Sequence, residues 1–326
     1  DPSNPNTVYL GSPAGGIWKS TNNGSTWTPL TDQLPQIGVS GIAVDYSNSN
    51  TIYIATGDKD AGDSYSVGVY KSTDGGLTWS PTGTMGGSNP SRAGDIVIHP
   101  TNNQILWCAT NNGIYKTTNA GTSWTQVQSG NFSQGNIRLK PGDPSTVYAV
   151  TTNRFYRSTD SGTTFSMITT GLPANSGRLL LDVTPANANY IYILSSTTGN
   201  AFQGIYRSTN GGTNWTKTSG TTDIFESTQA WYDLALAVSP TNENEIYASS
   251  YFSGLLKLEN DVATTLFNTT NSGLESLVDP GNPTYGPDIR VEQTAFDKTG
   301  NLWVSNGLIA NMFKVLKTNG QWQSFS

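Results

Sequence analysis

The sequence has little of what disulfides, zinc sites and catalytic triads require. Its 326 residues include one cysteine, Cys108, and one histidine, His99. A disulfide within the chain and a Cys/His zinc cluster are therefore excluded. A triad would have to use His99 itself, which precedes Pro100 and is predicted to lie in a turn. Cys108 lies in an apolar run and is predicted to be a buried small hydrophobe.

Charged residues and long apolar runs are scarce as well. Only 12% of the residues are charged, the 17 Lys and Arg form no basic cluster, and the net charge is -6. Neither nucleic acid nor an anionic membrane is therefore expected as a partner. No apolar run is long enough to span a bilayer, so no membrane insertion is expected. The apolar spacing typical of helices is absent, which favours an all-β chain.

An eight-residue pattern occurs five times and predicts a strand, a tight turn and a second strand. Its clearest copy spans Ser72 to Trp79, and each copy follows an aromatic residue and a Lys or Arg. Asx and Gly tolerate the positive φ of a hairpin, the hydroxyls bond back to the turn, and the aromatic starts the next strand. The structural positions of the five copies are Asn22, Gly24 and Trp27; Asp74, Gly76 and Trp79; Asn119, Gly121 and Trp124; Asp160, Gly162 and Phe165; Asn210, Gly212 and Trp215.

A second pattern, in which a Pro/Asn-rich turn precedes a strand with an aromatic residue, occurs seven times. Together the patterns give units of four strands at a period of about 40 to 50 residues, which is typical of propeller blades. The predicted fold is an all-β, single seven-bladed β-propeller of four-stranded antiparallel blades. The blades are predicted at residues 1–30, 39–82, 92–128, 136–168, 178–218, 232–267 and 289–326. Blade 1 should lack its innermost strand, because Asp1 stands in the turn that follows that strand, and we expect the native polypeptide to extend before Asp1.

The repeated turn resembles the Asp box, or BNR repeat, of sialidases, xyloglucanase-type glycoside hydrolases and sortilin-type receptors. That resemblance implies a β-propeller, with the boxes at blade edges away from the functional face. Blades 6 and 7 lack a true box. The segment from Phe296 to Val304 resembles instead blades of two-component-regulator propellers and of surface propellers tied to type IX secretion.

Function is predicted on the face where the loops vary in length. The loop Gly57–Gly68 holds Asp58, Asp60, Asp63 and Tyr65, and its three carboxylates suit a hard cation such as calcium or an acid/base pair. The alternative, that these carboxylates cap turns, is favoured because Asp so often serves turns. Aromatic and acidic residues in other loops suit stacking on sugars or contacts with protein, and they complete the candidate ligand-binding set: Trp231, Tyr232, Asp233, Tyr251, Phe252 and Asp288.

Two enzymatic alternatives follow from the resemblance. A sialidase-like site would use an arginine triad, and Arg92, Arg138 and Arg178 are the residues compared with it. The favoured interpretation is that these residues form ion pairs between the innermost strands. A xyloglucanase-like site would use a catalytic base in the first blade, where the stretch Gly11–Ile17 has no acid.

The sequence therefore predicts a binding module without catalysis of its own, at the bacterial cell surface or secreted. Its expected partners are a polysaccharide or a surface or secretion protein, within a longer secreted polypeptide. A glycoside hydrolase domain that uses loop carboxylates is the alternative. No cofactor is expected apart from calcium in the loop 57–68.

Overall fold

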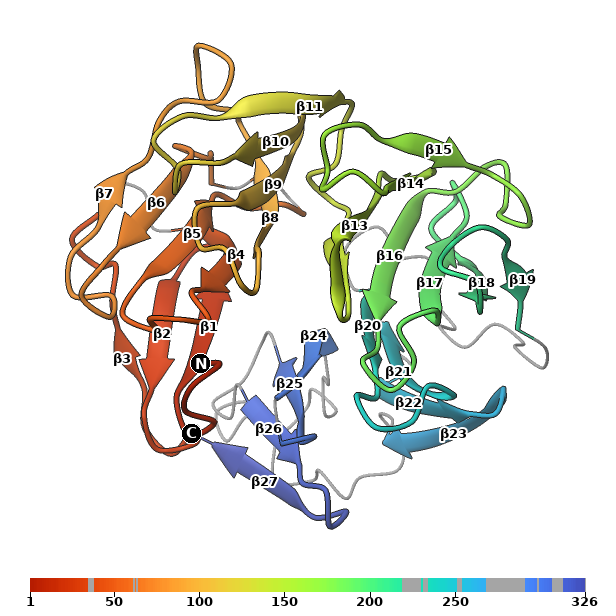
Figure 1. The fold of residues 1–326 in the computed structure, drawn as a ribbon. Coiled ribbons are helices and arrows are strands. Elements are labelled where there is room, and N and C mark those ends of the chain that lie inside the picture. The colour runs from red at the N-terminus through yellow and green to blue at the C-terminus, as the bar shows by residue number, and fades with distance from the viewer. Residues whose placement is uncertain are drawn as a thin grey trace. The chain divides into compact units, whose positions relative to one another are not determined.

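The structure is a computed structural model of the 326-residue chain, which folds into two compact units, Asp1–Ile168 and Thr169–Ser326. It describes residues 1–34, 38–60, 62, 64–218, 230, 234–250, 254–267, 291–297, 299–306 and 313–325. Antiparallel β-sheets make up both units (Figure 1). Within the described ranges there is no helix long and apolar enough to cross a membrane.

The first unit contains four sheets, each formed by strands that are consecutive in sequence. Blade 1 has three strands, β1 (Val8–Ser12), β2 (Gly16–Ser20) and β3 (Thr28–Pro29). Blade 2 comprises β4 (Val39–Val44), β5 (Ile52–Thr56), β6 (Val69–Ser72) and β7 (Ser80–Pro81). Blade 3 comprises β8 (Ala93–Ile98), β9 (Leu106–Thr110), β10 (Gly113–Thr117) and β11 (Thr125–Ser129). Blade 4 comprises β12 (Ile137–Lys140), β13 (Asp143–Val150), β14 (Phe155–Ser158) and β15 (Ser166–Ile168).

The second unit contains three sheets of the same design. Blade 5 comprises β16 (Arg178–Val183), β17 (Ile191–Ser196), β18 (Phe202–Ser208) and β19 (Thr216–Lys217). Blade 6 comprises β20 (Ala235–Val238), β21 (Glu245–Ser250), β22 (Gly254–Glu259) and β23 (Val262–Phe267). Blade 7 comprises β24 (Val291–Phe296), β25 (Leu302–Asn306), β26 (Phe313–Leu316) and β27 (Trp322–Phe325).

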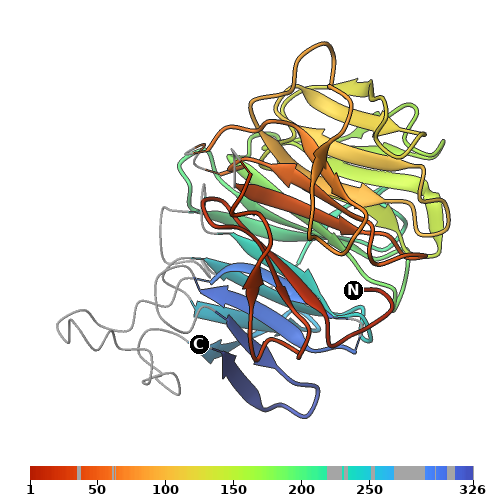
Figure 2. The same ribbon diagram turned by 90° about the vertical axis from the view of Figure 1, so that its left-hand side faces the viewer.

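These sheets confirm the predicted fold class. The chain is a seven-bladed β-propeller of four-stranded antiparallel blades, and blade 1 has three strands, as expected. Within the first unit, the first strands of blades 2, 3 and 4 lie beside one another, so that consecutive sheets pack face to face (Figure 1, Figure 2).

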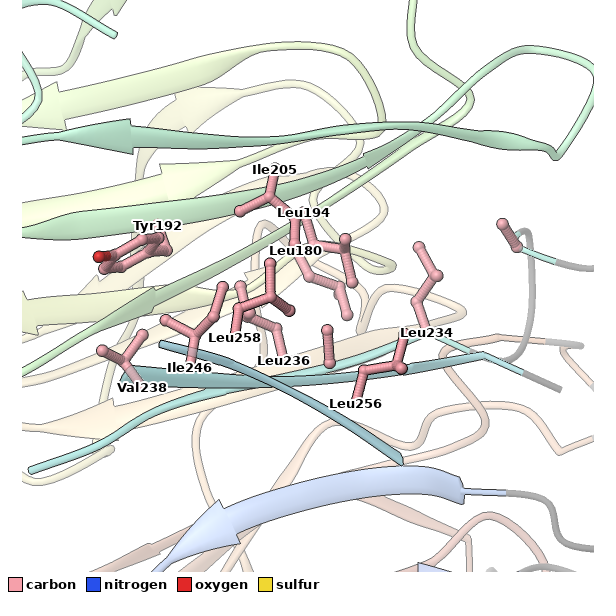
Figure 3. Close-up of a cluster of buried hydrophobic side chains, with 12 residues drawn as sticks. Leu180, Tyr192, Leu194, Ile205, Leu234, Leu236, Val238, Ile246, Leu256 and Leu258 are labelled. Atoms are coloured by element: carbon pink, nitrogen blue, oxygen red, sulfur yellow. The ribbon is translucent and has the colours of Figure 1, made fainter. Parts of the chain in front are cut away.

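The core lies between neighbouring sheets. In the second unit, side chains of blade 5 such as Leu180 and Leu194 pack against Leu236 and Leu258 of blade 6 (Figure 3). All five residues of β5 and all five of β9 are buried, because these second strands have sheet on both sides. Cys108 lies within β9 and is fully buried, which raises the pKa of its thiol and confirms it as a small core residue.

The five Asp-box turns share one hydrogen-bond pattern. In the second copy the buried Ser72 hydroxyl donates to Asp74 Oδ1 (2.8 Å) and accepts the Gly76 N–H (2.9 Å), while Asp74 Oδ1 accepts the Thr78 N–H (2.9 Å). The other copies repeat these bonds with Ser20, Thr117, Ser158 and Ser208 as the first hydroxyl. Because all partners lie within one turn, these bonds fix the conformation of each hairpin turn locally.

The turns between the first and second strands of blades 2 and 3 are also alike. Asp45 Oδ1 accepts the N–H of Ser47 (2.8 Å), and the Asp45 N–H donates to the Thr51 carbonyl (3.0 Å). His99 takes the place of Asp45 in blade 3, where its Nδ1 accepts the N–H of Thr101 (3.2 Å). Partial burial and the nearby Lys116 lower the pKa of His99, which favours the neutral ring that can accept these bonds. His99 is therefore a turn residue, as predicted.

The Asp-box hydroxyls should contribute measurably to stability. Changing Ser158 to Ala removes the acceptor of the buried Gly162 N–H, and an unsatisfied buried N–H costs about 1 to 3 kcal/mol. We expect the free energy of unfolding, measured by urea denaturation, to fall by that amount. Ser166→Ala, at an exposed position on the next strand, is the matched control. Equal stability of the two variants would contradict this role for the hydroxyl.

Two of the boxes carry Asp and three carry Asn, which predicts a specific response to acid. Hydrogen bonds from Thr78 and Ser72 lower the pKa of Asp74 to about 2, and bonds from Ser158 and Thr164 lower that of Asp160. Carboxyls with lowered pKa stabilise the fold above about pH 4, and this stabilisation is lost as the pH falls towards 2.

The double variant Asp74→Asn plus Asp160→Asn converts both turns to the Asn type found at Asn119. Its melting temperature should therefore fall less between pH 5 and pH 2 than that of the wild type, when both are followed by circular dichroism. Parallel melting curves for the two proteins across this range would contradict the assignment.

Candidate functional site

The variable loops of blades 1 to 3 lie against one another in the first unit. Ser64, in the loop between β5 and β6, donates its hydroxyl to the carbonyl of Pro13 in the first hairpin (2.8 Å). The Ser66 N–H donates to the carbonyl of Ser91, just before β8 (3.0 Å). Gln134 Nε2, just before β12, donates to the Asp60 carbonyl (3.3 Å). The loop 57–68 therefore contacts three neighbouring loops. We call this loop, together with its contact residues Pro13, Ser91 and Gln134, the acidic loop site.

Asp58 closes a turn inside this loop. Its Oδ1 accepts the Asp60 N–H (2.9 Å), its own N–H donates to the Ser64 carbonyl (2.9 Å), and only 3% of the residue is exposed. The loop is further fixed by Ser40, whose hydroxyl accepts the Lys59 N–H (3.0 Å). These contacts support the interpretation that Asp58 serves the loop backbone.

Gly62 brings the loop close to Arg92. It has a φ of +76°, which favours glycine, and a Cβ at this position would lie 2.5 Å from Arg92 Nη2. Arg92 is held through its backbone, since its N–H donates to Asn111 Oδ1 (3.0 Å). The Arg92 guanidinium therefore lies beside the loop 57–68. From this position it can donate hydrogen bonds to a ligand that is rich in oxygen atoms.

Tyr65 is the most exposed large side chain of the site. It is 72% exposed, the highest value among the large hydrophobic and aromatic residues that the structure describes. The residues on both sides of it, Ser64 and Ser66, are anchored by the bonds given above. An exposed ring on an anchored backbone loses little entropy when a partner binds, so Tyr65 is suited to stacking.

Buried hydroxyls at the ends of second strands shape these loops, and the sequence analysis missed them. Thr56 Oγ1 donates to the Gly68 carbonyl (2.6 Å) and accepts the Val67 N–H (2.9 Å). In blade 3, Thr110 Oγ1 donates to the Gly113 carbonyl (2.8 Å). Each of these threonines is the last residue of a second strand. An alignment of the repeats at this position would therefore have revealed them.

The first hairpin holds no carboxylate. Ser12 Oγ accepts the Gly15 N–H (3.0 Å), and Trp18 Nε1 donates to the Gly15 carbonyl (2.8 Å), so the tip is a small closed turn. This is the stretch in which the xyloglucanase resemblance would place a catalytic base. The loop 57–68 contacts this hairpin through the hydrogen bond from Ser64 to Pro13.

Charges on the first strands form interstrand pairs. Arg138 Nη1 lies 2.7 Å from Asp95 Oδ2, which also accepts the Ile137 N–H (3.1 Å), and these groups join blades 3 and 4. In the second unit Asp182 Oδ2 accepts the Val238 N–H (3.0 Å). Arg138 is thus engaged by a carboxylate of the protein, which supports the ion-pair interpretation over an arginine triad.

Several predicted site residues lie outside the described residues: Asp63, Trp231, Tyr232, Asp233, Tyr251, Phe252 and Asp288. The structure brings together Asp58, Asp60 and Tyr65 on one loop. Among the residues it describes, no three His, Cys, Asp or Glu side chains are grouped so that they could hold a metal ion.

Comparisons with known proteins agree with this fold. The chain is, by its sheets and turns, a β-propeller of the Asp-box type. The family model Sortilin-Vps10, described as "Sortilin, neurotensin receptor 3", matches residues 112–276, just over half of the chain. The chain belongs to this family.

Xyloglucanases are among its relatives in sequence. Xyloglucanase Xgh74A of Acetivibrio thermocellus is 33% identical over 135 residues, which are 37% of this chain and 16% of the relative. A xyloglucanase of a Paenibacillus species is 29% identical over 135 residues, 37% of this chain and 13% of the relative. The matches therefore cover less than a fifth of each relative.

Solved structures share the fold over nearly the whole chain. The Niastella koreensis GH74 enzyme matches with a TM-score of 0.69 at 21% identity, over 97% of this chain and 52% of that one. The GH74 xyloglucanase of Xanthomonas campestris gives 0.70 at 14% identity, over 99% and 53%. A structure of YCF48 bound to D1 peptide gives 0.62 at 15% identity, over 99% and 89%. At these identities the likeness is one of fold.

Calcium binding by the loop 57–68 stays a prediction with a direct test. If the loop holds the ion, a chelator should lower the melting temperature, because a ligand that binds only the folded state stabilises it. Asp58→Asn combined with Asp60→Asn should abolish this response, while Asp32→Asn, in another loop, should leave it unchanged. An unchanged melting curve of the wild type in chelator would rule out the ion.

Proposed function

We propose that the propeller binds a polysaccharide through the acidic loop site, without catalysis of its own. The observation that carries this proposal is the exposed Tyr65 on a loop anchored to three neighbours. Flat aromatic rings with polar groups beside them suit sugar rings, whose faces are apolar and whose edges carry hydroxyls. The same loop offers polar groups: Arg92 lies beside Gly62, and Gln134 bonds to the Asp60 carbonyl.

The relatives support a glycan as the ligand. Xyloglucanases act on xyloglucan by name, and this chain matches part of two of them. A xyloglucan-type polysaccharide is therefore the first ligand to test. We further propose that the protein works outside the cell or on a bacterial surface, within a larger binding protein or hydrolase. A surface or secretion protein is the alternative partner for the same exposed loops.

Hydrolysis is the second candidate function. It is favoured by the xyloglucanase relatives and by the carboxylates of the loop 57–68. An inverting glycosidase needs two carboxyls about 6.5 to 9.5 Å apart, one of them able to act on water. Asp58 is buried and serves its own turn, and the first hairpin carries no acid, so we favour binding over catalysis.

Tyr65→Ala should weaken polysaccharide binding. Loss of one aromatic stacking contact costs about 1 kcal/mol, so the Kd measured by calorimetry with soluble xyloglucan should rise roughly fivefold to tenfold. Tyr65→Phe should retain most of the affinity because the ring remains. The matched control is Tyr46→Ala, in the turn before β5 of the same blade, where the tyrosine is 55% exposed.

Equal loss of affinity in the two alanine variants would move the binding surface away from the acidic loop site. The same samples are assayed for release of reducing sugar. Activity that survives Tyr65→Ala but is lost in Asp60→Asn would support the hydrolase instead.

A further inference from the structure

The turn that leads into the second strand of a blade, called the first turn below, uses a side-chain acceptor at one repeated position. The residue at this position accepts the backbone N–H two residues later. The acceptor atom is an oxygen in five of the described first turns, at Asp1, Asp45, Thr184, Ser239 and Asp297. In blade 3 it is a nitrogen, because His99 Nδ1 accepts the N–H of Thr101 (3.2 Å) and of Asn102 (3.1 Å).

These two contacts fix the protonation state of His99. Both donors are backbone N–H groups, so Nδ1 carries no hydrogen and the neutral ring is the Nε2–H tautomer. A further proton can bind only at Nδ1. Because a protonated Nδ1 is a donor, protonation of His99 removes both acceptor bonds of the turn at once.

The surroundings of His99 disfavour the charged ring. The imidazole stacks on Trp107 (ring centroids 6.3 Å apart, 26° between planes), and Lys116 Nζ lies 5.7 Å from the centroid of the same indole. Burial, followed by the charge of Lys116, lowers the pKa of His99. Lys116 itself faces Asp160, and the other charged residue at this turn is Asp45, to which the turn is hydrogen-bonded. These two carboxylates and Lys116 keep their charges between pH 7.5 and 5.5, so His99 is the group that titrates there.

The same turn joins blade 3 to blade 2. Asn103 Nδ2 donates to Asp45 Oδ2 (2.9 Å) and to Ser47 Oγ (3.3 Å), which belong to the first turn of blade 2. Asn103 directly follows Asn102, whose N–H is held by His99. The position of the Asn103 side chain therefore depends on the bonds that protonation would remove.

We propose that His99 makes the first turn of blade 3 acid-sensitive, so that protonation of Nδ1 opens the turn and loosens the contact of Asn103 with Asp45. The five turns listed above keep their oxygen acceptors in the same pH range. The folded state binds a proton at His99 less readily than the unfolded chain, where a histidine has a pKa of about 6.5. The stabilisation by the turn is therefore complete above about pH 7 and is lost as the pH falls below about 6.5. This range lies above the one expected for Asp74 and Asp160.

The test compares the wild type with His99→Asn, which offers an oxygen acceptor that does not titrate. Between pH 7.5 and pH 5.5 the melting temperature of the wild type should fall about 2 °C further than that of His99→Asn. The matched control is His99→Ala, which lacks an acceptor at both pH values. It should be less stable than the wild type at pH 7.5 and should follow His99→Asn in its response to pH. Parallel curves for the wild type and His99→Asn would overturn the proposal, as would a smaller fall in the wild type.

Nuclear magnetic resonance of the wild type provides a measurement that depends on no variant's folding. His99 is the single histidine of the chain, so its two ring nitrogens give one pair of signals. They should show the Nε2–H tautomer at pH 7.5 and a pKa below 6.5, and an Nδ1–H tautomer would overturn the proposal. The side-chain amide signal of Asn103, assigned with Asn103→Ala, should shift with the same midpoint in the wild type and stay fixed in His99→Asn. A fixed signal in the wild type would overturn the effect on the contact between blades 2 and 3.

Discussion

The bond from the first hydroxyl of each Asp box to a buried glycine N–H is the interaction on which the rest of the structure depends. It fixes the hairpin between the third and fourth strands, as Ser158 does with Gly162. Once the hairpin is fixed, the box also reaches inward: in blade 2 the Gly75 N–H donates to the Asn50 carbonyl (2.9 Å), in the turn between β4 and β5. Both turns of a blade are thereby joined at one edge, and the variable loops are left at the other.

In blades 2 and 3 the tryptophan that ends the box links the blade to the one before it. Trp79 Nε1 donates to the Leu30 carbonyl (3.0 Å), and Trp124 Nε1 donates to Thr82 Oγ1 (3.1 Å). The spacing of blades in the first unit therefore follows from side chains that belong to the repeats. The loops of the acidic loop site lie on this framework, which is why a loop with an exposed tyrosine can have a defined backbone.

Much of this could be predicted from the sequence, and the reason is the short range of the interactions. Asp74 and Thr78 are four residues apart, and the role of His99 follows from the two residues after it. The loop contacts could not be predicted in the same way. Pro13, Ser91 and Gln134 all contact the loop 57–68, yet they come from segments tens of residues apart that carry no shared motif.

The sequence by itself determined the number of blades, the type of each turn, the burial of Cys108 and the missing strand of blade 1, because period and local hydrogen bonding specify these. Only the tertiary structure decided which segments contact the loop that carries Tyr65, that Arg138 pairs with Asp95, and that Asp58 is buried. Those features depend on the stacking of one sheet on the next, which brings side chains of different blades within hydrogen-bonding distance. No local pattern in the chain encodes that distance.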